Sequence, residues 1–168
     1  MAVKEGQPGL PHPKIALPKE LYGTERSNSS GLDLANEHRL ASLSSALLNS
    51  AAQKWQAIPV LEQPVVEGEL TPVKNPAEPT DVVGYTREAT SEEVSLALEN
   101  AVNHAPIWFA TPPQERAAIL ERAAVMMESR MQQLIGILVR EAGKTFSNAI
   151  AEVREAVGLP ALLRRPGT

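Results

Sequence analysis

The amino-acid sequence predicts an α+β fragment made of an extended arm, one long helix, a small β-ribbon and a group of antiparallel helices. Apolar residues recur at helical spacing in five stretches, each bounded by residues that start or stop helices. Between the first two stretches, prolines interrupt short β-prone runs, which is typical of a small sheet with tight turns. Only 4% of the 168 residues are aromatic, so we expect an aliphatic core.

Residues 1–31 are predicted to form an extended arm or linker. Proline, glycine, serine and charged residues dominate this segment, and no apolar periodicity runs through it. Such a segment needs a larger surface on which to lie. We therefore expect the arm to lack packed contacts with a core.

A long helix is predicted from about Leu34 to Trp55, with Asp33 or Asn36 as its N-cap and Pro59 just beyond its end. Its apolar residues fall on one stripe: Leu40, Leu43, Leu47, Leu48 and Ala51.

The segment from residue 60 to residue 90 is predicted to form a β-ribbon. Its candidate strands are residues 65–66, 70–74 and 81–87. Asn75-Pro76-Ala77-Glu78-Pro79 has the composition of a turn between the last two. Two or three antiparallel strands are therefore expected.

Two helices should follow the ribbon. The first begins at a capping box, in which Glu93 follows Thr90 by three residues, and is expected to end at Pro106. Its stripe comprises Val94, Ala97, Leu98, Ala101 and Val102.

The next helix is predicted to begin with Thr111 as its cap, Pro112 at the first helical position and Gln114 completing the capping box. Its inner face comprises Ala117, Leu120, Ala124 and Met127.

The last two predicted helices are separated by Gly143, which is expected to stop the helix over about residues 130–142. That helix should bury Met131, Leu134, Ile135, Leu138 and Val139. The final helix starts near Thr145, and Gly158 and Pro160 are expected to break it. Its stripe comprises Phe146, Ala149, Val153, Ala156 and Val157.

Composition argues against several classes of function. The net charge of −4, with both signs mixed, lacks the basic footprint of a nucleic-acid-binding protein. There is no cysteine, which removes disulfides and thiolate nucleophiles. No apolar run reaches the roughly 18 residues of a membrane span, and residues 1–9 lack the apolar region of a secretory signal. The expected location is the cytoplasm.

Several groups of residues invite a functional interpretation, but each has a simpler structural one. Gly143-Lys144-Thr145 resembles the end of a phosphate-binding loop, yet Leu138 stands where that loop needs a glycine. The histidines lack a second metal ligand at suitable spacing: His12, His38 and His104. Solvated surfaces are expected for the acidic pairs, Glu92/Glu93 and Glu152/Glu155, and packing roles for Trp55 and Trp108. We therefore predict no catalytic, cofactor-binding or metal-binding residue in this chain.

From Val73 onward, the order of motifs resembles the aldehyde dehydrogenase superfamily of oxidoreductases. The matching motifs are Asn75-Pro76-Ala77 with Val83-Gly84, the helix from Thr90 to Leu98, Trp108 with Glu115-Arg116-Ala117, and Glu141-Ala142-Gly143-Lys144-Thr145. One branch is more similar still, over about residues 10–157: the L-glutamate γ-semialdehyde (1-pyrroline-5-carboxylate) dehydrogenase part of bacterial bifunctional proline utilization A proteins. That similarity rests on residues 12–18, 32–40, 75–87, 105–113 and 139–157.

The resemblance implies a parent enzyme that oxidises L-glutamate γ-semialdehyde to glutamate with NAD, in proline catabolism. The family's catalytic cysteine, catalytic glutamate, oxyanion-hole asparagine and NAD-binding glycine turn lie beyond the matching segment, so none is carried over to a residue here. We expect this chain alone to bind no NAD and to be inactive. Its expected partner is the missing downstream part of the same enzyme.

The last residues depart from the family, which continues Asp-Phe-Leu-His-Tyr-Tyr-Ala-Gly-Gln-Val after the position of Val157. The codons GGA CTT CCT GCA CTA CTA CGC CGG CCA GGT would encode residues 158–167 of this chain. Without their first base they read GAC TTC CTG CAC TAC TAC GCC GGC CAG GT, which encodes the family's continuation. We therefore predict an arm over 1–31, an N-terminal aldehyde dehydrogenase fragment over 32–157, and an out-of-frame tail over 158–168.

A free-standing helical interaction module is the second hypothesis, since it too would lack catalytic residues. Such a module would not, however, end in a sequence whose codons, shifted by one base, encode the family's continuation. A DNA-binding role is disfavoured by the charge balance.

Overall fold

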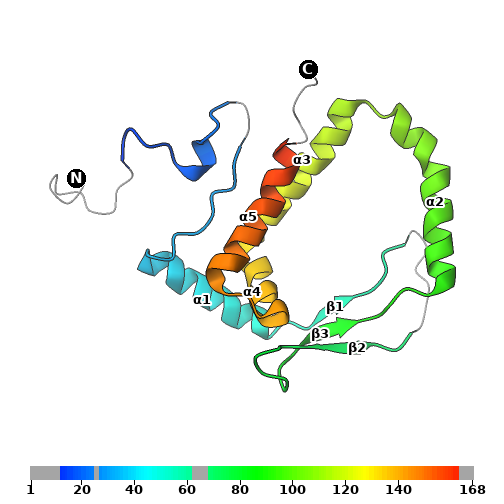
Figure 1. The fold of residues 1–168 in the computed structure, drawn as a ribbon, viewed down its shortest axis with the longest axis horizontal. Helices are drawn as coiled ribbons and strands as arrows, with labels where there is room; N and C mark the ends of the chain where they lie inside the picture. The colour runs from blue at the N-terminus through cyan, green and yellow to red at the C-terminus, as the bar shows by residue number, and fades with distance from the viewer. Residues whose placement is uncertain (1–11, 25–26, 62–67, 163–168) are drawn as a thin grey trace.

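The structure is a computed structural model that describes residues 12–24, 27–61 and 68–162 (Figure 1). It confirms the α+β class, with a helical bundle beside a small sheet. Along the chain the elements are η1 (Pro18–Glu20, a 3-10 helix), α1 (Glu37–Ala51), β1 (Trp55–Ala57), β2 (Thr71–Lys74), β3 (Val82–Thr86), α2 (Ser91–Ala110), α3 (Pro113–Ser129), α4 (Met131–Ala142) and α5 (Phe146–Leu162). Within the described part of the chain, no helix combines the length and apolar character that a membrane span requires.

Helix α4 lies at the centre of the core, in contact with α1, α3, α5 and strand β3. Ile135 on α4 is completely buried, and Leu43 on α1 is 1% exposed. The core cluster consists of Leu43, Met131, Ile135, Ala149, Ile150, Val153 and Val157. Gly143 ends α4 with φ of 63°, a left-handed conformation that favours glycine. The predicted helix and its stop are thus confirmed.

Helix α1 is shorter than predicted, and only two of the five residues in its predicted stripe, Leu43 and Leu47, are covered. Of the two candidate caps, Asn36 is the N-cap, because its side chain accepts a hydrogen bond from the Arg39 backbone N–H at 3.1 Å. The helix ends before Trp55 because Trp55 begins strand β1. Leu48 is 72% exposed, since α4 covers the opposite side of α1 where Leu43 lies.

The three strands are ordered β1-β3-β2. Strands β2 and β3 are antiparallel, as predicted, whereas β1 pairs with β3 in parallel, which corrects the expected all-antiparallel ribbon. Gly84 lies opposite Trp55, and a Cβ on Gly84 would stand 2.6 Å from the Trp55 carbonyl oxygen. Glycine is therefore required there by close backbone approach. The predicted strand at residues 65–66 lies outside the described residues.

The predicted boundary between α2 and α3 is wrong by several residues. Helix α2 continues past Pro106 to Ala110. Proline leaves the Val102 carbonyl without a helical donor, but Val102 is 71% exposed, so water can reach that carbonyl. Thr111 then closes α2, with its hydroxyl donating to the Ile107 carbonyl at 2.9 Å. It therefore does not cap α3, whose N-cap is Pro112.

Helix α5 also runs further than predicted, through Gly158 and Pro160 to Leu162. Val157 is 8% exposed and holds this end of α5 against the core. A proline this close to a helix end removes one backbone hydrogen bond and leaves the preceding turns intact. The structure therefore sets no boundary at Gly158.

Helix α2 stands away from the bundle in Figure 1, and its predicted apolar stripe is uncovered. Val94, Leu98 and Val102 are 49%, 64% and 71% exposed. Among the described residues of α2, Glu93 is the one that is buried. Contiguous exposure of this kind marks a face made for contact with a larger body.

Replacing Ile135 by alanine is expected to destabilise the fold by about 2 to 5 kcal/mol, because it leaves a cavity where α1, α4 and α5 meet. Leu48→Ala, at a 72% exposed position, is the matched control and should change the free energy of unfolding by less than about 1 kcal/mol. Urea unfolding followed by circular dichroism measures both. Equal effects of the two substitutions would contradict the assigned core.

Candidate functional site

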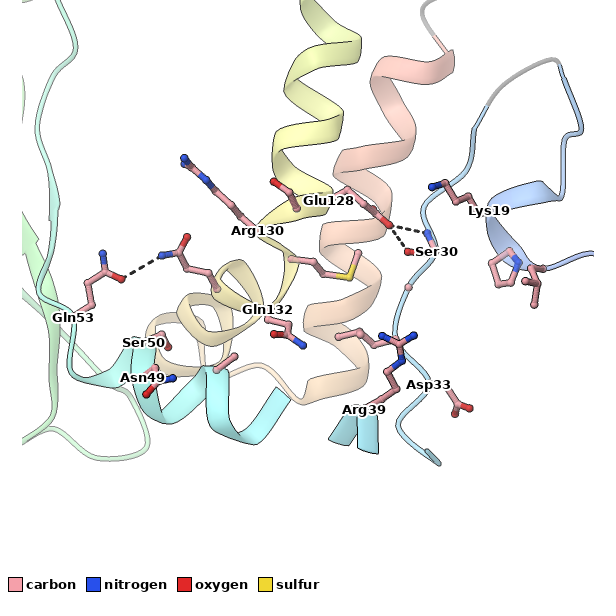
Figure 2. A pocket seen from close by; sticks show the side chains of 18 residues that line it. Lys19, Ser30, Asp33, Arg39, Asn49, Ser50, Gln53, Glu128, Arg130 and Gln132 are labelled. Atoms are coloured by element: carbon pink, nitrogen blue, oxygen red, sulfur yellow. Dashed lines mark hydrogen bonds between the residues drawn. The ribbon is translucent and has the colours of Figure 1, made fainter. Parts of the chain in front are cut away.

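A groove of about 880 Å3 lies where the arm crosses the ends of α1 and α4 (Figure 2). One wall comes from arm residues 17–19, 30 and 31 with the adjoining residues 32 and 33, and the others come from α1 and from the junction of α3 with α4. Amide side chains line its floor, where Gln133 Nε2 donates to Gln53 Oε1 at 3.2 Å. Polar side chains predominate among the lining residues, and the hydroxyl–carboxylate pair among them, Ser30 with Glu128, fastens the arm.

The arm is fastened beside this groove by the carboxylate of Glu128 at the end of α3. Ser29 Oγ donates to Glu128 Oε2 at 3.0 Å, and Ser30 donates to Oε1 from its backbone N–H at 2.9 Å and from its hydroxyl. Burial opposes the charged form, but the hydrogen bonds from Ser30 and Ser29 outweigh it and lower the pKa of the Glu128 carboxyl. Ser29 is 1% exposed, so the expected absence of packed contacts along the arm is wrong at this point.

A buried ion pair holds the start of α2 against the end of β3. Arg87 binds the Glu93 carboxylate through both terminal nitrogens, at 2.7 and 2.8 Å. The Thr90 backbone N–H donates to the same carboxylate at 2.9 Å, which completes the predicted capping box. The Arg87 hydrogen bonds, followed by the one from Thr90, lower the pKa of Glu93 to about 2. The expectation of a solvated surface is therefore wrong for Glu93, although Glu92 is exposed.

A second ion pair ties the ribbon to the bundle. Arg140 on α4 donates to both oxygens of Asp81, at 2.6 and 3.1 Å. Asn75 Nδ2 donates to Asp81 at 3.1 Å from across the turn. The Arg140 hydrogen bond is the main cause that lowers the pKa of Asp81. This arrangement positions the sheet on α4.

The motif at residues 143–145 is structural as well. The segment before Gly143 is helix α4, whereas a phosphate-binding loop follows a strand. Lys144 Nζ bonds Glu152 Oε1 at 2.6 Å, so this lysine is engaged by α5. Glu152 and Glu155 lie on the exposed surface, as predicted.

The other candidate residues do not converge. His12, His38 and His104 are exposed, and the described residues contain no cluster of side chains able to hold a metal ion. Trp55 is half-buried in β1, and Trp108 is 41% exposed with the Arg116 guanidinium 5.7 Å from its ring centroid. Sequence reasoning missed Glu128 and the Asp81–Arg140 pair, because their partners are far away in the chain and leave no local pattern.

Comparison with known proteins places these features in a family. The Aldehyde dehydrogenase family model matches residues 65–162. The Bifunctional protein PutA of Escherichia coli is 80% identical over 157 residues, which make up 94% of this chain and 12% of that protein. The chain therefore spans about an eighth of the length of this curated relative.

Two solved structures extend the similarity to the fold. Proline utilization A from Bdellovibrio bacteriovorus superposes with a TM-score of 0.75 at 25% identity, covering 80% of this chain and 14% of that one. The 1-pyrroline-5-carboxylate dehydrogenase of Thermus thermophilus has a TM-score of 0.70 at 27% identity, covering 90% of this chain and 27% of its own. Both relatives contain this arrangement of elements within a longer chain.

Replacing Glu93 by glutamine is expected to lower the melting temperature by several degrees at pH 7, because the Arg87 side chain, 9% exposed, loses its counter-charge. The depressed pKa of Glu93 gives stability that is complete above about pH 4.5 and is lost as the pH falls toward about 2. The variant should lose this part of the pH dependence. Glu92→Gln, at the neighbouring exposed position, is the control. Indistinguishable melting of the two variants across this pH range would refute the role of the pair.

Proposed function

The chain belongs to the aldehyde dehydrogenase family, and we propose that it is the N-terminal part of an NAD-dependent L-glutamate γ-semialdehyde dehydrogenase of proline catabolism. The observation that carries this proposal is the 80% identity to PutA across nearly the whole chain. The likeness in fold to a 1-pyrroline-5-carboxylate dehydrogenase supports the same aldehyde substrate. Because the chain spans only a small share of these relatives, the activity is proposed for the parent enzyme.

We further propose that the chain alone performs no step of the oxidation. Covalent catalysis in this family needs a thiolate, and the sequence contains no cysteine. The described residues also do not fit a dinucleotide, because Lys144 is paired with Glu152 and the loop before it follows a helix. What these residues supply is a scaffold, in which the two buried or half-buried ion pairs fix the sheet and α2 relative to α4.

The proposed partner is the remainder of such an enzyme. The relatives are several times longer than the segment they share with this chain. Helices α2 and α3 expose large apolar side chains, among them Leu98, Val102, Phe109 and Val125. A free-standing module would be expected to cover such faces itself.

The tail over residues 158–168 is proposed to be out of frame. The alignment with PutA covers 157 of the 168 residues, and the family model matches as far as residue 162, so the proposal rests on the decoded codons. The continuation of α5 to Leu162 does not oppose the proposal, because an unrelated apolar sequence can extend a helix that is already formed.

The purified chain should produce no NADH from γ-semialdehyde and saturating NAD, and calorimetry should detect no NAD binding. A full-length homologue assayed in parallel serves as the positive control. Turnover above background, or heat that saturates with NAD, would show that the chain holds catalytic or cofactor-binding residues that we have not identified.

The genomic sequence across the codon of Val157 should contain one extra base relative to the coding sequence of a full-length homologue. Restoring the frame should give Asp-Phe-Leu-His-Tyr-Tyr after that codon. If the genomic codons of residues 158–167 do not encode the family's continuation in either other frame, the tail is not a shifted copy of it.

A further inference from the structure

We propose that α2 is a self-association surface, at which two copies of this chain pair their α2 helices antiparallel about a two-fold axis. The surface is one stripe along the helix: Val94, Leu98, Ala101, Ala105 and Trp108. The inference concerns the chain by itself, without the remainder of an enzyme, and does not rest on the proposed function.

The stripe has the spacing of a coiled-coil seam. Its five positions are separated by four, three, four and three residues, which is the alternation of the a and d positions in a heptad. Pro106 falls outside these positions, so it does not interrupt the seam. Leu98 is 64% exposed, and α2 stands away from the bundle in Figure 1. A seam of this kind is completed by a second helix.

The order of large and small residues in the stripe favours an antiparallel partner. In a parallel pair each residue meets its own copy, so Ala101 and Ala105 would face alanines and leave gaps. In an antiparallel pair whose axis passes beside Glu99, Val94 of one copy faces Ala105 of the other, and Leu98 faces Ala101. Large residues against small ones fill the space between the helices. Antiparallel helices also place their opposite dipole ends side by side.

The same register brings opposite charges together at both ends of the pair. Glu92 lies exposed in the first turn of α2, and in this register it meets Trp108 of the second copy. The Arg116 guanidinium lies 5.7 Å from the centroid of the Trp108 ring, and its buried Nε has no hydrogen-bond partner among the described residues. Glu92 cannot reach Arg116 of its own chain, because sixteen residues of helix, about 24 Å, separate it from Trp108.

The area of the surface indicates a weak dimer. Five large apolar side chains would be covered in each copy: Val94, Leu98, Val102, Trp108 and Phe109. Their exposed parts amount to about 400 Å2 per copy at the usual sizes of such side chains. Two copies together therefore bury less than the roughly 1,200 Å2 at which stable interfaces begin. We expect a monomer at micromolar concentration and a dimer toward millimolar concentration.

Sedimentation equilibrium of the whole chain over this concentration range tests the proposal. The chain should change from monomer to dimer and form no larger species, because a two-fold interface closes on itself. Leu98→Glu should raise the dissociation constant roughly tenfold or more, since it places two like charges in the seam. Leu48→Glu on α1, at a 72% exposed position outside the stripe, is the matched control and should leave the dissociation constant unchanged.

An exchange of charges tests the orientation of the two helices. Glu92→Arg and Arg116→Glu, each alone, should weaken the dimer because like charges then meet. The two substitutions combined in one chain should restore it. Because the two residues cannot meet within one chain, recovery reports contact between copies. Circular dichroism should show the same helix content in every variant.

Single spin labels decide the orientation if Arg116→Glu loses helix content, since the chain has no cysteine of its own. Labels at Glu99→Cys, beside the axis, should lie close together in the dimer. Labels at Ala110→Cys, at the end of α2, should lie tens of ångströms further apart. Equal distances at the two positions would mean a parallel pair and would overturn the proposal.

Three other results would also overturn it. A chain that stays monomeric to millimolar concentration would leave this face to the remainder of the enzyme. Equal effects of Leu98→Glu and Leu48→Glu would place the interface elsewhere. Failure of the doubly substituted chain to recover, with its helix content intact, would reject the register.

Discussion

Burial of one face of α4 is the packing on which the rest of the structure depends. This helix has only 12 residues, a length that is marginal for an isolated helix in water. Its stability comes from Ile135 and Met131, which meet residues of α1 and α5 in the core. The same helix carries Arg140, whose bond to Asp81 places the sheet. A single short helix thus organises both the bundle and the ribbon.

Helix α2, in contrast to α4, is held by polar interactions and not by burial of an apolar face. It is the longer helix, with 20 residues, yet it is fixed mainly at its first turn by the Arg87–Glu93 pair and the capping box. Its apolar residues remain exposed, so its position depends on charge and hydrogen bonding. We interpret this as a helix that completes its packing in a larger enzyme, in agreement with the greater length of the relatives.

Local signals predicted the features that depend on local chemistry. The stripe of α4, its stop at Gly143 and the Thr90 capping box follow from spacing and residue type alone, whereas the Asn36 cap was one of two candidates beside Asp33. The expected stops at Pro106 and at Gly158 with Pro160 were wrong, because a helix tolerates a proline where water can reach the freed carbonyl or where few turns remain. Strand β1 was missed because a three-residue strand is defined by its partner and not by its own pattern.

The ion pair at Asp81 and the hydrogen bonds from Ser29 and Ser30 to Glu128 could not be predicted for a related reason. Each joins residues that only the tertiary fold brings together.

Amide hydrogen exchange over the whole chain tests the central claim, that α4 anchors an independent core and that α2 lacks a covering partner within it. We predict the slowest exchange in α4 and the facing turns of α5, and exchange in α2 beyond its first turn that is faster by orders of magnitude. Protection of α2 equal to that of α4 would contradict the account.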